Sequence, residues 1–490
     1  MNDRERILTR EILTLASVVI LGSIMTILDA TIVNVALATL GQRFHTSIAT
    51  IQWVATIYLL AFASVIPMTA WASERFGARR VWIGSLLVFM LGSLLSGLAW
   101  SIGALIAFRA LQGFGGGMIL PLGQTILAEA AGRERLGRVM SFVGVPMLLA
   151  PIFGPAIGGA LIAGASWRWI FFVNLPVGAV AVALALRFLP SVPQRRGERL
   201  DGRGLALLGT GIALFVYGLS RVGSSGAFGD AVTLATVGIG LLLIASFAWH
   251  ALRRENALLD LRLFARRGYA TAVGTNFLLG VALFGVLVLL PLYFQTIRGA
   301  SPLRTGLLMV PQGVGAALAM PIAGALTDRL GARRVVPAGI VVGLLGTAAY
   351  TQISAGTSYW YLALALFVIG LGLGATIMPS MAVAYQAVPG RAVAAATSTM
   401  NTLLRIAGSL GVALMAVILQ RAIAAKLPGF QGALTEAAAL AANRPEARAA
   451  IASAFAATFW VALGLAAVAL FPACLLPRPS RARTSGPAPA

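Results

Sequence analysis

The stretch AWASERFGARR (70–80) recurs 254 residues later as GALTDRLGARR (324–334). Each copy follows the second apolar segment of a set and precedes the third. The repeat therefore divides the chain into two sets of six apolar segments, with two further segments between the sets. Repeated halves in membrane transporters enclose a site near the membrane midplane, and rocking of the halves opens that site to either side in turn.

The composition indicates an integral membrane protein. Of the 490 residues, 59% are hydrophobic and 11% are charged, whereas soluble proteins carry about 25% charged residues. Segments of about 20 apolar residues are long enough to cross a hydrocarbon core about 30 Å thick. We therefore predict an all-α polytopic membrane protein. Its fourteen predicted spans are 11–34, 48–71, 81–100, 103–127, 137–163, 168–189, 203–221, 231–251, 269–297, 304–327, 335–353, 359–385, 393–420 and 453–476.

These spans give the expected organisation of the chain. We predict an N-terminal six-helix bundle at 1–189 and a linker with two additional transmembrane helices at 190–268. A C-terminal six-helix bundle follows at 269–476, and a disordered cytoplasmic tail at 477–490. The leucines of LRRENALLDLRLFARRG (252–268) predict a short helix along the membrane surface.

The net charge of +22 orients the chain in the membrane. With a cytoplasmic N-terminus, 26 of the 37 Lys and Arg residues fall in cytoplasmic segments, 9 in outer segments and two, Arg109 and Arg405, inside helices. This is the positive-inside pattern, and it places the C-terminus in the cytoplasm as well. The basic segments favour contact with anionic lipid. Nucleic-acid binding would need one contiguous basic domain outside the membrane, and none is present.

The sequence argues against redox, metal and enzyme chemistry. A single cysteine, Cys474, excludes an intrachain disulfide, and His45 and His250 are not spaced with acids as metal ligands would be. No glycine-rich phosphate loop indicates direct use of ATP. We find no nucleophile–base constellation typical of an enzyme.

Asp29 lies in LGSIMTILDATIVNVAL (21–37) and is the only one of fifteen acidic residues well inside an apolar segment. A charge at the centre of a bilayer costs about 2.5–3.5 kcal/mol on insertion scales, so such an acid normally faces the protein interior. A carboxylate held between apolar surroundings and a cation can load and release a proton as its surroundings change. The alternative is a structural acid fixed by hydrogen bonds. On a helix, Asp29 shares a face with Gly22, Met25, Thr26, Val33 and Ala36.

Arg109 is the expected partner of Asp29. Counted along the helices, Asp29 lies roughly 27 Å from the inner end of its span, and Arg109 roughly 9 Å from the outer end of an opposite-running span. Both residues therefore belong to the outer half of the membrane. Arg109 shares a stripe with Gln112, Gly113 and Gly116. An arginine at this depth must be paired or hydrated, and the alternative role is a clamp on backbone carbonyls.

The fifth span reads AxxxGPxxGG, formed by Ala150, Gly154, Pro155, Gly158 and Gly159. Small residues four apart permit close helix contact, and the proline bends the helix. We interpret this pattern as a tight seam that seals the protein against proton leak while the halves move.

A polar stripe marks the thirteenth span. Arg405 lies roughly 18 Å from the inner end of this span, near mid-depth. It either faces a cavity or binds helix carbonyls. The other members of the stripe are Ser398, Asn401, Thr402, Gly408 and Ser409.

The repeated loops each combine an acid, arginines and a glycine that permits a tight turn. Topology charges alone do not explain an acid at the same place in both copies, so we predict acid–arginine latches at the inner surface. The latch residues are Glu74, Arg75, Gly77, Arg79 and Arg80 in the first copy, and Asp328, Arg329, Gly331, Arg333 and Arg334 in the second.

Together these motifs resemble the major facilitator superfamily, in particular its 14-helix drug/proton antiporters of the QacA/EmrB type. The resemblance covers about residues 10–475. Five stretches carry it: LDATIVNVAL (28–37), RALQGFGGG (109–117), APIFGPAIGG (150–159), WRWIFFVNLPVG (167–178) and NTLLRIAGSLG (401–411).

The resemblance implies a major facilitator fold, with two six-helix bundles plus two extra central helices, and multidrug efflux by alternating access. It implies Asp29 as the protonation site, Arg109 as the proton-coupling arginine and Gly154–Gly159 as the antiporter seam. The protein is then an antiporter of the bacterial inner membrane that uses the proton gradient and no cofactor. Its partners are small-molecule substrates, protons and the bilayer, and the EmrB type suggests a periplasmic adaptor protein. Export of an endogenous metabolite, lipid or siderophore is the alternative.

Two departures from the family pattern bear on mechanism and substrate. Ala70 and Ala72 stand where the family favours Gly and Leu, and Glu74 replaces the usual Asp. Family members that export dications often carry a second intramembrane acid, whereas the tenth span here offers Gln312. We therefore expect lipophilic monocations or neutral amphiphiles as substrates. The candidate substrate contacts are Gln52, Trp53, Tyr58, Gln112, Asn276, Tyr293, Gln295, Gln312, Asn401 and Arg405.

Overall fold

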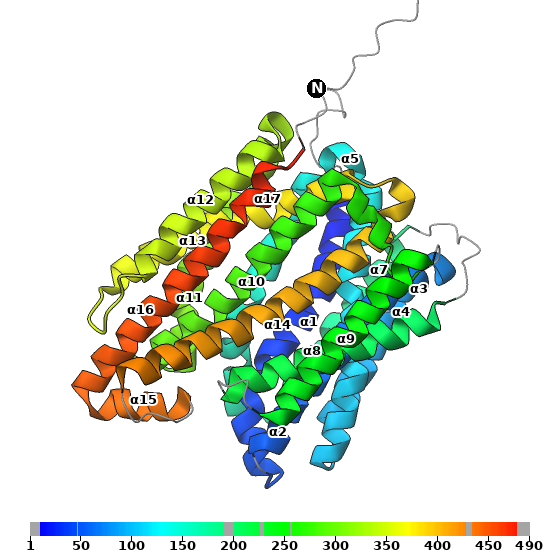
Figure 1. Ribbon diagram of the computed structural model, residues 1–490. Helices are drawn as coiled ribbons and strands as arrows, with labels where there is room; N and C mark the ends of the chain where they lie inside the picture. The colour runs from blue at the N-terminus through cyan, green and yellow to red at the C-terminus, as the bar shows by residue number, and fades with distance from the viewer. Residues whose placement is uncertain are drawn as a thin grey trace, which may run out of the picture.

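The computed structural model describes residues 10–46, 48–190, 200–225, 230–254, 257–427 and 434–477, and these form a bundle of long helices (Figure 1). The predicted tail lies outside the described residues except for Pro477. The N-terminal helices are α1 (Arg10–Arg43), α2 (Ile48–Val65), η2 (Ile66–Met68), α3 (Thr69–Phe76), α4 (Ala78–Gly97), α5 (Ile102–Gly164), α6 (Trp169–Phe172) and α7 (Asn174–Phe188).

The central pair follows, and then the C-terminal helices. The central pair consists of α8 (Gly202–Ser225) and α9 (Ala231–Arg253). The C-terminal helices are η3 (Leu261–Ala265), α10 (Arg267–Thr296), α11 (Pro302–Leu330), α12 (Ala332–Tyr350), α13 (Tyr359–Gln386), η4 (Gly390–Ala392), α14 (Val393–Lys426), α15 (Leu434–Asn443), α16 (Pro445–Val468) and α17 (Leu470–Cys474).

Within the described residues, thirteen helical stretches are long and apolar enough to cross a membrane. Large apolar side chains such as Trp360, Leu242 and Leu345 point outward from them. A soluble protein would bury most of these side chains, whereas a bilayer solvates them. The chain is therefore a multi-pass membrane protein. The predicted span 137–163 is not among the thirteen and lies in the second part of α5.

Helix α5 contains a reversal of chain direction. Its 63 residues would extend about 95 Å if the helix were straight. Arg109 near its start nevertheless pairs with Asp29, while Gly158 near its end lies against Ile32 in the same part of α1. The two ends of α5 therefore meet, and the chain turns back between them. We expected a break at 128–136, but AEAAGRERL consists mainly of good helix formers and stays helical.

Two ends of the bundle serve as reference points. The Arg10 end contains the start of α1 and the turns after α3 and α11, and the α15 end is opposite to it. Figure 1 shows α17 toward the upper, Arg10 end and α15 across the lower ends of α14 and α16. Helix α8 packs between α2 and α14, and α9 covers α8 from outside.

The hydrophobic core is shared at one end of the bundle and divided at the other. At the Arg10 end a single cluster joins both sets of helices, for example Met140 of α5 with Met320 of α11 and Tyr385 of α13. Toward the α15 end the N-terminal and C-terminal helices have separate clusters. The two sets of helices are therefore pressed together at the Arg10 end.

The segment before α10 differs from the expected surface helix. Leu258, Leu259 and Leu263 are buried, and the first two pack against Leu208 and Phe247 of the central pair. Only Leu261–Ala265 is helical, as a short 3₁₀ turn. The prediction of a helix along the membrane surface was wrong because these leucines bury their side chains in the protein.

Candidate functional site

Close contact between α5 and α2 sets the position of Arg109. The motif RALQGFGGG (109–117) places Gly113 against the carbonyl oxygen of Tyr58 and Gly117 against the carbonyl oxygen of Phe62. A Cβ atom at either glycine would overlap these backbone atoms. The glycines therefore let the two helix backbones touch, and Arg109 is held beside α2.

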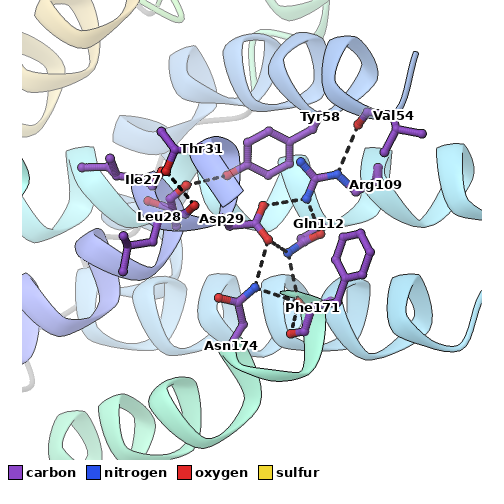
Figure 2. A network of polar contacts seen from close by, with 12 residues as sticks. Ile27, Leu28, Asp29, Thr31, Val54, Tyr58, Arg109, Gln112, Phe171 and Asn174 are labelled. Atoms are coloured by element: carbon purple, nitrogen blue, oxygen red, sulfur yellow. Dashed lines mark hydrogen bonds and ion pairs between the residues drawn. The ribbon is translucent and has the colours of Figure 1, made fainter. Parts of the chain in front are cut away.

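Asp29 and Arg109 form a fully buried ion pair (Figure 2). The Nη1 atom of Arg109 donates to Oδ2 of Asp29 over 2.6 Å, and also to Oε1 of Gln112 over 2.6 Å. Gln112 in turn donates from Nε2 to Oδ1 of Asp29 over 2.9 Å. Gln112 therefore bridges the arginine and the carboxylate.

A second amide completes the surroundings of the carboxylate. Asn174, at the start of α7, donates from Nδ2 to Oδ1 of Asp29 over 2.9 Å. Both Asn174 and Gln112 also reach the hydroxyl of Ser93 on α4, which donates to the carbonyl oxygen of Phe171. Neither Asn174 nor Ser93 was among the residues predicted from the sequence. The available signal was an asparagine inside the apolar motif WRWIFFVNLPVG (167–178).

The rest of the Arg109 guanidinium faces α2. Its Nε atom donates to the carbonyl oxygen of Val54 over 3.2 Å, and its Cζ atom lies 4.1 Å from the centre of the Tyr58 ring. Tyr58 donates its own hydroxyl to the carbonyl oxygen of Thr26 on α1. The two roles considered for Arg109, partner of Asp29 and clamp on a carbonyl, are therefore combined in one side chain.

The contacts between several helices depend on the charge of Asp29. The carboxylate accepts hydrogen bonds from α5 and α7, and its partners contact α2 and α4. A buried ion pair is strongly destabilised when one partner loses its charge. Loss of the charge on Asp29 would therefore weaken contacts between these helices.

The glycines of the fifth predicted span lie against α1. Gly154 would place a Cβ atom on the side chain of Thr31, and Gly158 would place one 3.2–3.3 Å from atoms of Ile32. Gly159 faces open space. The expected close seam is therefore present at two of its five residues, while the side chains of Ala150 and Pro155 lie outside the described residues.

The polar stripe of the thirteenth span divides between two environments. Near the start of α14, Ser398 donates to the carbonyl oxygen of Ile66, and Asn401 donates to Oε1 of Gln124 on α5. Tyr385 donates to the same Gln124 oxygen. These contacts join the N-terminal and C-terminal helices at the Arg10 end.

Farther along α14, Arg405 lines a cavity of about 220 Å³ with Gly408 and Ser409. The Cζ atom of Arg405 lies 4.2 Å from the centre of the Phe62 ring. Thr402, the remaining stripe residue, is buried. The structure thus favours the cavity-facing alternative for Arg405.

The comparison with protein families now decides the identity of the fold. Residues 19–412 match the model of the Major Facilitator Superfamily. This chain belongs to the Major Facilitator Superfamily. It is 43% identical over 411 residues to a multidrug resistance protein B homolog of Mycobacterium tuberculosis, a match that covers 83% of this chain and 76% of the relative.

Solved structures agree at the level of the fold. The human organic anion transporter MFSD10 has a TM-score of 0.59 and 17% identity, with 94% of this chain and 100% of that chain covered. The proton:xylose symporter XylE has a TM-score of 0.58 and 16% identity, with 94% of each chain covered. At such identities the likeness supports the major facilitator fold and says nothing about substrate.

The two copies of the repeated loop adopt the same turn in this facilitator. Gly77 has φ and ψ angles of 86° and 132°, and Gly331 has 82° and 147°. A positive φ angle favours glycine, so the shape of the turn explains why glycine occurs at the same place in both copies. Arg79 donates to the carbonyl oxygen of Leu186 at the end of α7. Exposed side chains at the same end are Arg75, Arg80, Asp328, Arg329, Arg333 and Arg334, and Glu74 is half-buried.

In the part of the chain that the structure describes, the candidate substrate contacts lie in several different environments. Tyr58 belongs to the Asp29 site, and Trp53 stacks on Tyr217 beside a separate cavity of about 650 Å³ between α2, α5 and α8. In the C-terminal half, Asn276 donates a hydrogen bond to the hydroxyl of Ser380, and Tyr293 donates one to the carbonyl oxygen of Ser354. Of the remaining candidates, Gln312 is buried in α11, and Gln52 and Gln295 are exposed near helix ends.

His250, which seemed unpaired in the sequence, contacts a buried acid. Its Nε2 atom lies 3.0 Å from Oδ1 of Asp201. Oδ1 also accepts from Arg254 and from the backbone N–H of Gly204, and Oδ2 accepts from the backbone N–H of Leu258. Burial favours a higher pKa for Asp201, but the hydrogen bonds from Gly204 and His250 together hold that pKa below its usual value. The cluster joins α8, α9 and the segment before α10.

Proposed function

We propose that this facilitator exports lipophilic compounds by proton-coupled antiport, with Asp29 as the proton-binding group. The buried Asp29–Arg109 pair carries the proposal. An ionisable residue inside a membrane protein is expensive to place and usually has a functional task. The name of the Mycobacterium tuberculosis relative supports drugs as substrates.

The proposed cycle alternates between two openings. With the cavity open to the cytoplasm, substrate enters and Asp29 releases its proton on that side. The loaded protein then opens outward, a proton from outside reaches Asp29, and the substrate leaves. The described conformation, closed at the Arg10 end and ion-paired at Asp29, fits the state that awaits an external proton.

We assign the chain to the 14-helix QacA/EmrB branch of the superfamily. The reversal within α5 supports fourteen spans, because it supplies two crossings within one continuous helix. We retain the division into bundles at 1–189 and 269–476 with an additional pair at 190–268. In the bacterial inner membrane, both termini and the Arg10 end lie in the cytoplasm, as the positive-inside pattern indicates.

We propose lipophilic monocations and neutral amphiphiles as substrates, since the tenth span carries no acid for a second cationic charge. Export of an endogenous metabolite, lipid or siderophore is the alternative, and the proposed partners include a periplasmic adaptor protein. In this proposal the two repeated loops act as latches at the cytoplasmic surface.

Asp29→Asn tests the proposal. The amide keeps the volume and much of the hydrogen bonding of the acid but does not titrate, so we expect folded protein and at least a tenfold loss of uphill ethidium export from cells. Asp230→Asn is the matched control, because its partly exposed ion pair with Arg221 lies at the start of α9, outside the proton site.

A protonophore provides the second arm of this experiment. Collapse of the proton gradient should reduce ethidium export by the wild-type protein to the level of Asp29→Asn. Undiminished export by Asp29→Asn, or export that survives the protonophore, would refute proton coupling through this residue.

A further inference from the structure

Arg405 is a cation inside the membrane that pairs with no acid among the described residues. It lies in α14, twelve residues after Val393, which places it roughly 18 Å along the helix. In the part of the chain that the structure describes, no acidic side chain lies within ion-pair distance of Arg405, and its guanidinium donates to no backbone carbonyl. Its contact is the face of the Phe62 ring, at 4.2 Å.

The Phe62 contact does not replace an anion. A cation–π contact contributes less free energy than it costs to place a charge at the centre of a bilayer. Intramembrane arginines normally pair or face a water-filled cavity. Arg405 faces the cavity of about 220 Å³, so its missing counter-charge has room to enter from outside the protein.

The walls of this cavity fit an amphiphile. Helices α2, α8, α10 and α14 line it, with apolar surface from residues such as Leu219 and Phe284. The hydroxyl-bearing residues Thr56, Ser220 and Ser409 also border it. A small number of polar groups in a mainly apolar pocket is typical of a small-molecule site. One central helix, α8, forms part of the wall, so the additional pair contributes to the site.

Two aromatic rings connect the cavity with the proton site. Phe62, which lies under Arg405, has its ring centre 5.9 Å from that of Tyr58 on the same helix. The Tyr58 ring in turn lies 4.1 Å from the guanidinium of Arg109, the partner of Asp29. A charge that binds Arg405 is therefore separated from the Asp29–Arg109 pair by one turn of α2.

We propose that this cavity binds amphiphilic monoanions, such as aromatic carboxylates, and that Arg405 is their charge-recognising residue. The cavity would repel lipophilic cations, so such cations would bind elsewhere. The inference goes beyond the proposed function by adding an anionic substrate class, and it rests on that function only for the transport of the bound anion.

Equilibrium binding to the full-length protein in phosphatidylcholine nanodiscs tests the proposal without a proton gradient. The probes are radiolabelled 1-naphthaleneacetate and its uncharged analogue 1-naphthaleneacetamide, which share one ring system. A hydrogen bond to a charged group contributes about 1.5–3 kcal/mol, so we expect the anion to bind the wild-type protein at least tenfold more tightly than the amide. Arg405→Gln should remove this preference and leave amide binding within twofold.

Three comparisons complete the design. Arg421→Gln, an exposed arginine on the same helix, should bind both probes as the wild-type protein does, and Arg405→Lys should keep part of the preference. Adding phosphatidylglycerol to the nanodiscs distinguishes a lipid anion from a soluble one. If the cavity takes a lipid anion, phosphatidylglycerol should displace 1-naphthaleneacetate from the wild-type protein, and this displacement should require Arg405. An unchanged preference for the anion in Arg405→Gln would overturn the proposal. Equal affinity of the wild-type protein for the anion and the amide would also overturn it, and this outcome does not depend on how well Arg405→Gln folds.

Because binding is measured without a gradient, the result is independent of proton coupling. Loss of coupling would appear in the Asp29→Asn export experiment, whereas loss of anion recognition appears here.

Discussion

At the level of single side chains, the central feature is the set of donors around one buried carboxylate. Asp29 receives hydrogen bonds from Arg109, Gln112 and Asn174. The sequence predicted the first pair, because an isolated acid and an isolated arginine at the same membrane depth must compensate each other. It did not predict Asn174, since helix rotation and tertiary packing decide which polar groups of other spans face the acid.

Asn174→Ala tests the contribution of this third donor. The variant removes one hydrogen bond to a buried carboxylate and one to Ser93, so we expect a loss of about 2 kcal/mol in the free energy of unfolding. We also expect several-fold slower proton-driven export, because Asp29 is less firmly positioned. Denaturation of purified protein and vesicle transport assays measure the two effects.

Asn34→Ala provides the matched control for this prediction, since Asn34 is an exposed amide on α1. It should leave both quantities near the wild-type values. Equal behaviour of the two variants would argue against a positioning role for Asn174.

At the level of helices, hydropathy predicted the order of the apolar segments, and each of the thirteen spans found in the described residues overlaps a predicted one. It failed at α5, where residues between two expected spans remain helical, and at Leu258 and Leu259, which pack inside the protein. The first failure follows from the helix-forming residues between the two spans. The second arises because an apolar pattern does not indicate whether a segment faces lipid or protein.

Gly154→Ala tests the seam between α5 and α1. The added methyl group would overlap the Thr31 side chain, and overpacking of this kind costs typically about 1–3 kcal/mol. We expect a lower melting temperature and slower export in Gly154→Ala. Gly159→Ala, which meets open space, should match the wild-type protein; equal destabilisation by both substitutions would contradict the seam.

Asp201→Asn tests the cluster that joins the central pair to α10. Burial favours a higher pKa for Asp201, but hydrogen bonds from Gly204 and His250 lower the pKa below the usual 3.8. The charged form therefore stabilises the fold above pH 3.8, and this contribution disappears as the pH falls further. We expect the variant to lose about 2 kcal/mol of stability at pH 7, with a smaller difference from wild type below pH 3.8.

Thermal unfolding of wild type and Asp201→Asn across this pH range measures the effect. Glu11→Gln serves as its control, because Glu11 is an exposed acid in the first turn of α1. A stability difference that stays constant down to the lowest pH would show that the Asp201 carboxylate charge is not the source.

At the level of the complete chain, the two sets of helices share one core at the Arg10 end and have separate cores toward the α15 end. The contacts of Gln124 with Asn401 and Tyr385 reinforce the closed end. The internal repeat predicted two related halves, but it could not indicate which end is closed. Nor could it place Arg405 on the wall of a cavity that α8 also lines, because this arrangement depends on where the central pair packs.

The cavity also changes the expectation for substrates. The absence of a second intramembrane acid favoured monocations and neutral compounds, yet the residue that enters the cavity is a cation. An arginine without a protein anion suits a negatively charged or neutral cargo better than a positive one. The sequence contained Arg405, but only the structure places it on a cavity wall.

The most direct test of the account measures proton and substrate movement together in proteoliposomes after an imposed pH step. With a pH-sensitive dye inside the vesicles, the wild-type protein should couple substrate transport to proton movement in the opposite direction, and Asp29→Asn should show neither uphill transport nor coupled protons. Uphill substrate transport without proton movement, or coupled proton movement in Asp29→Asn at the wild-type rate, would contradict the account.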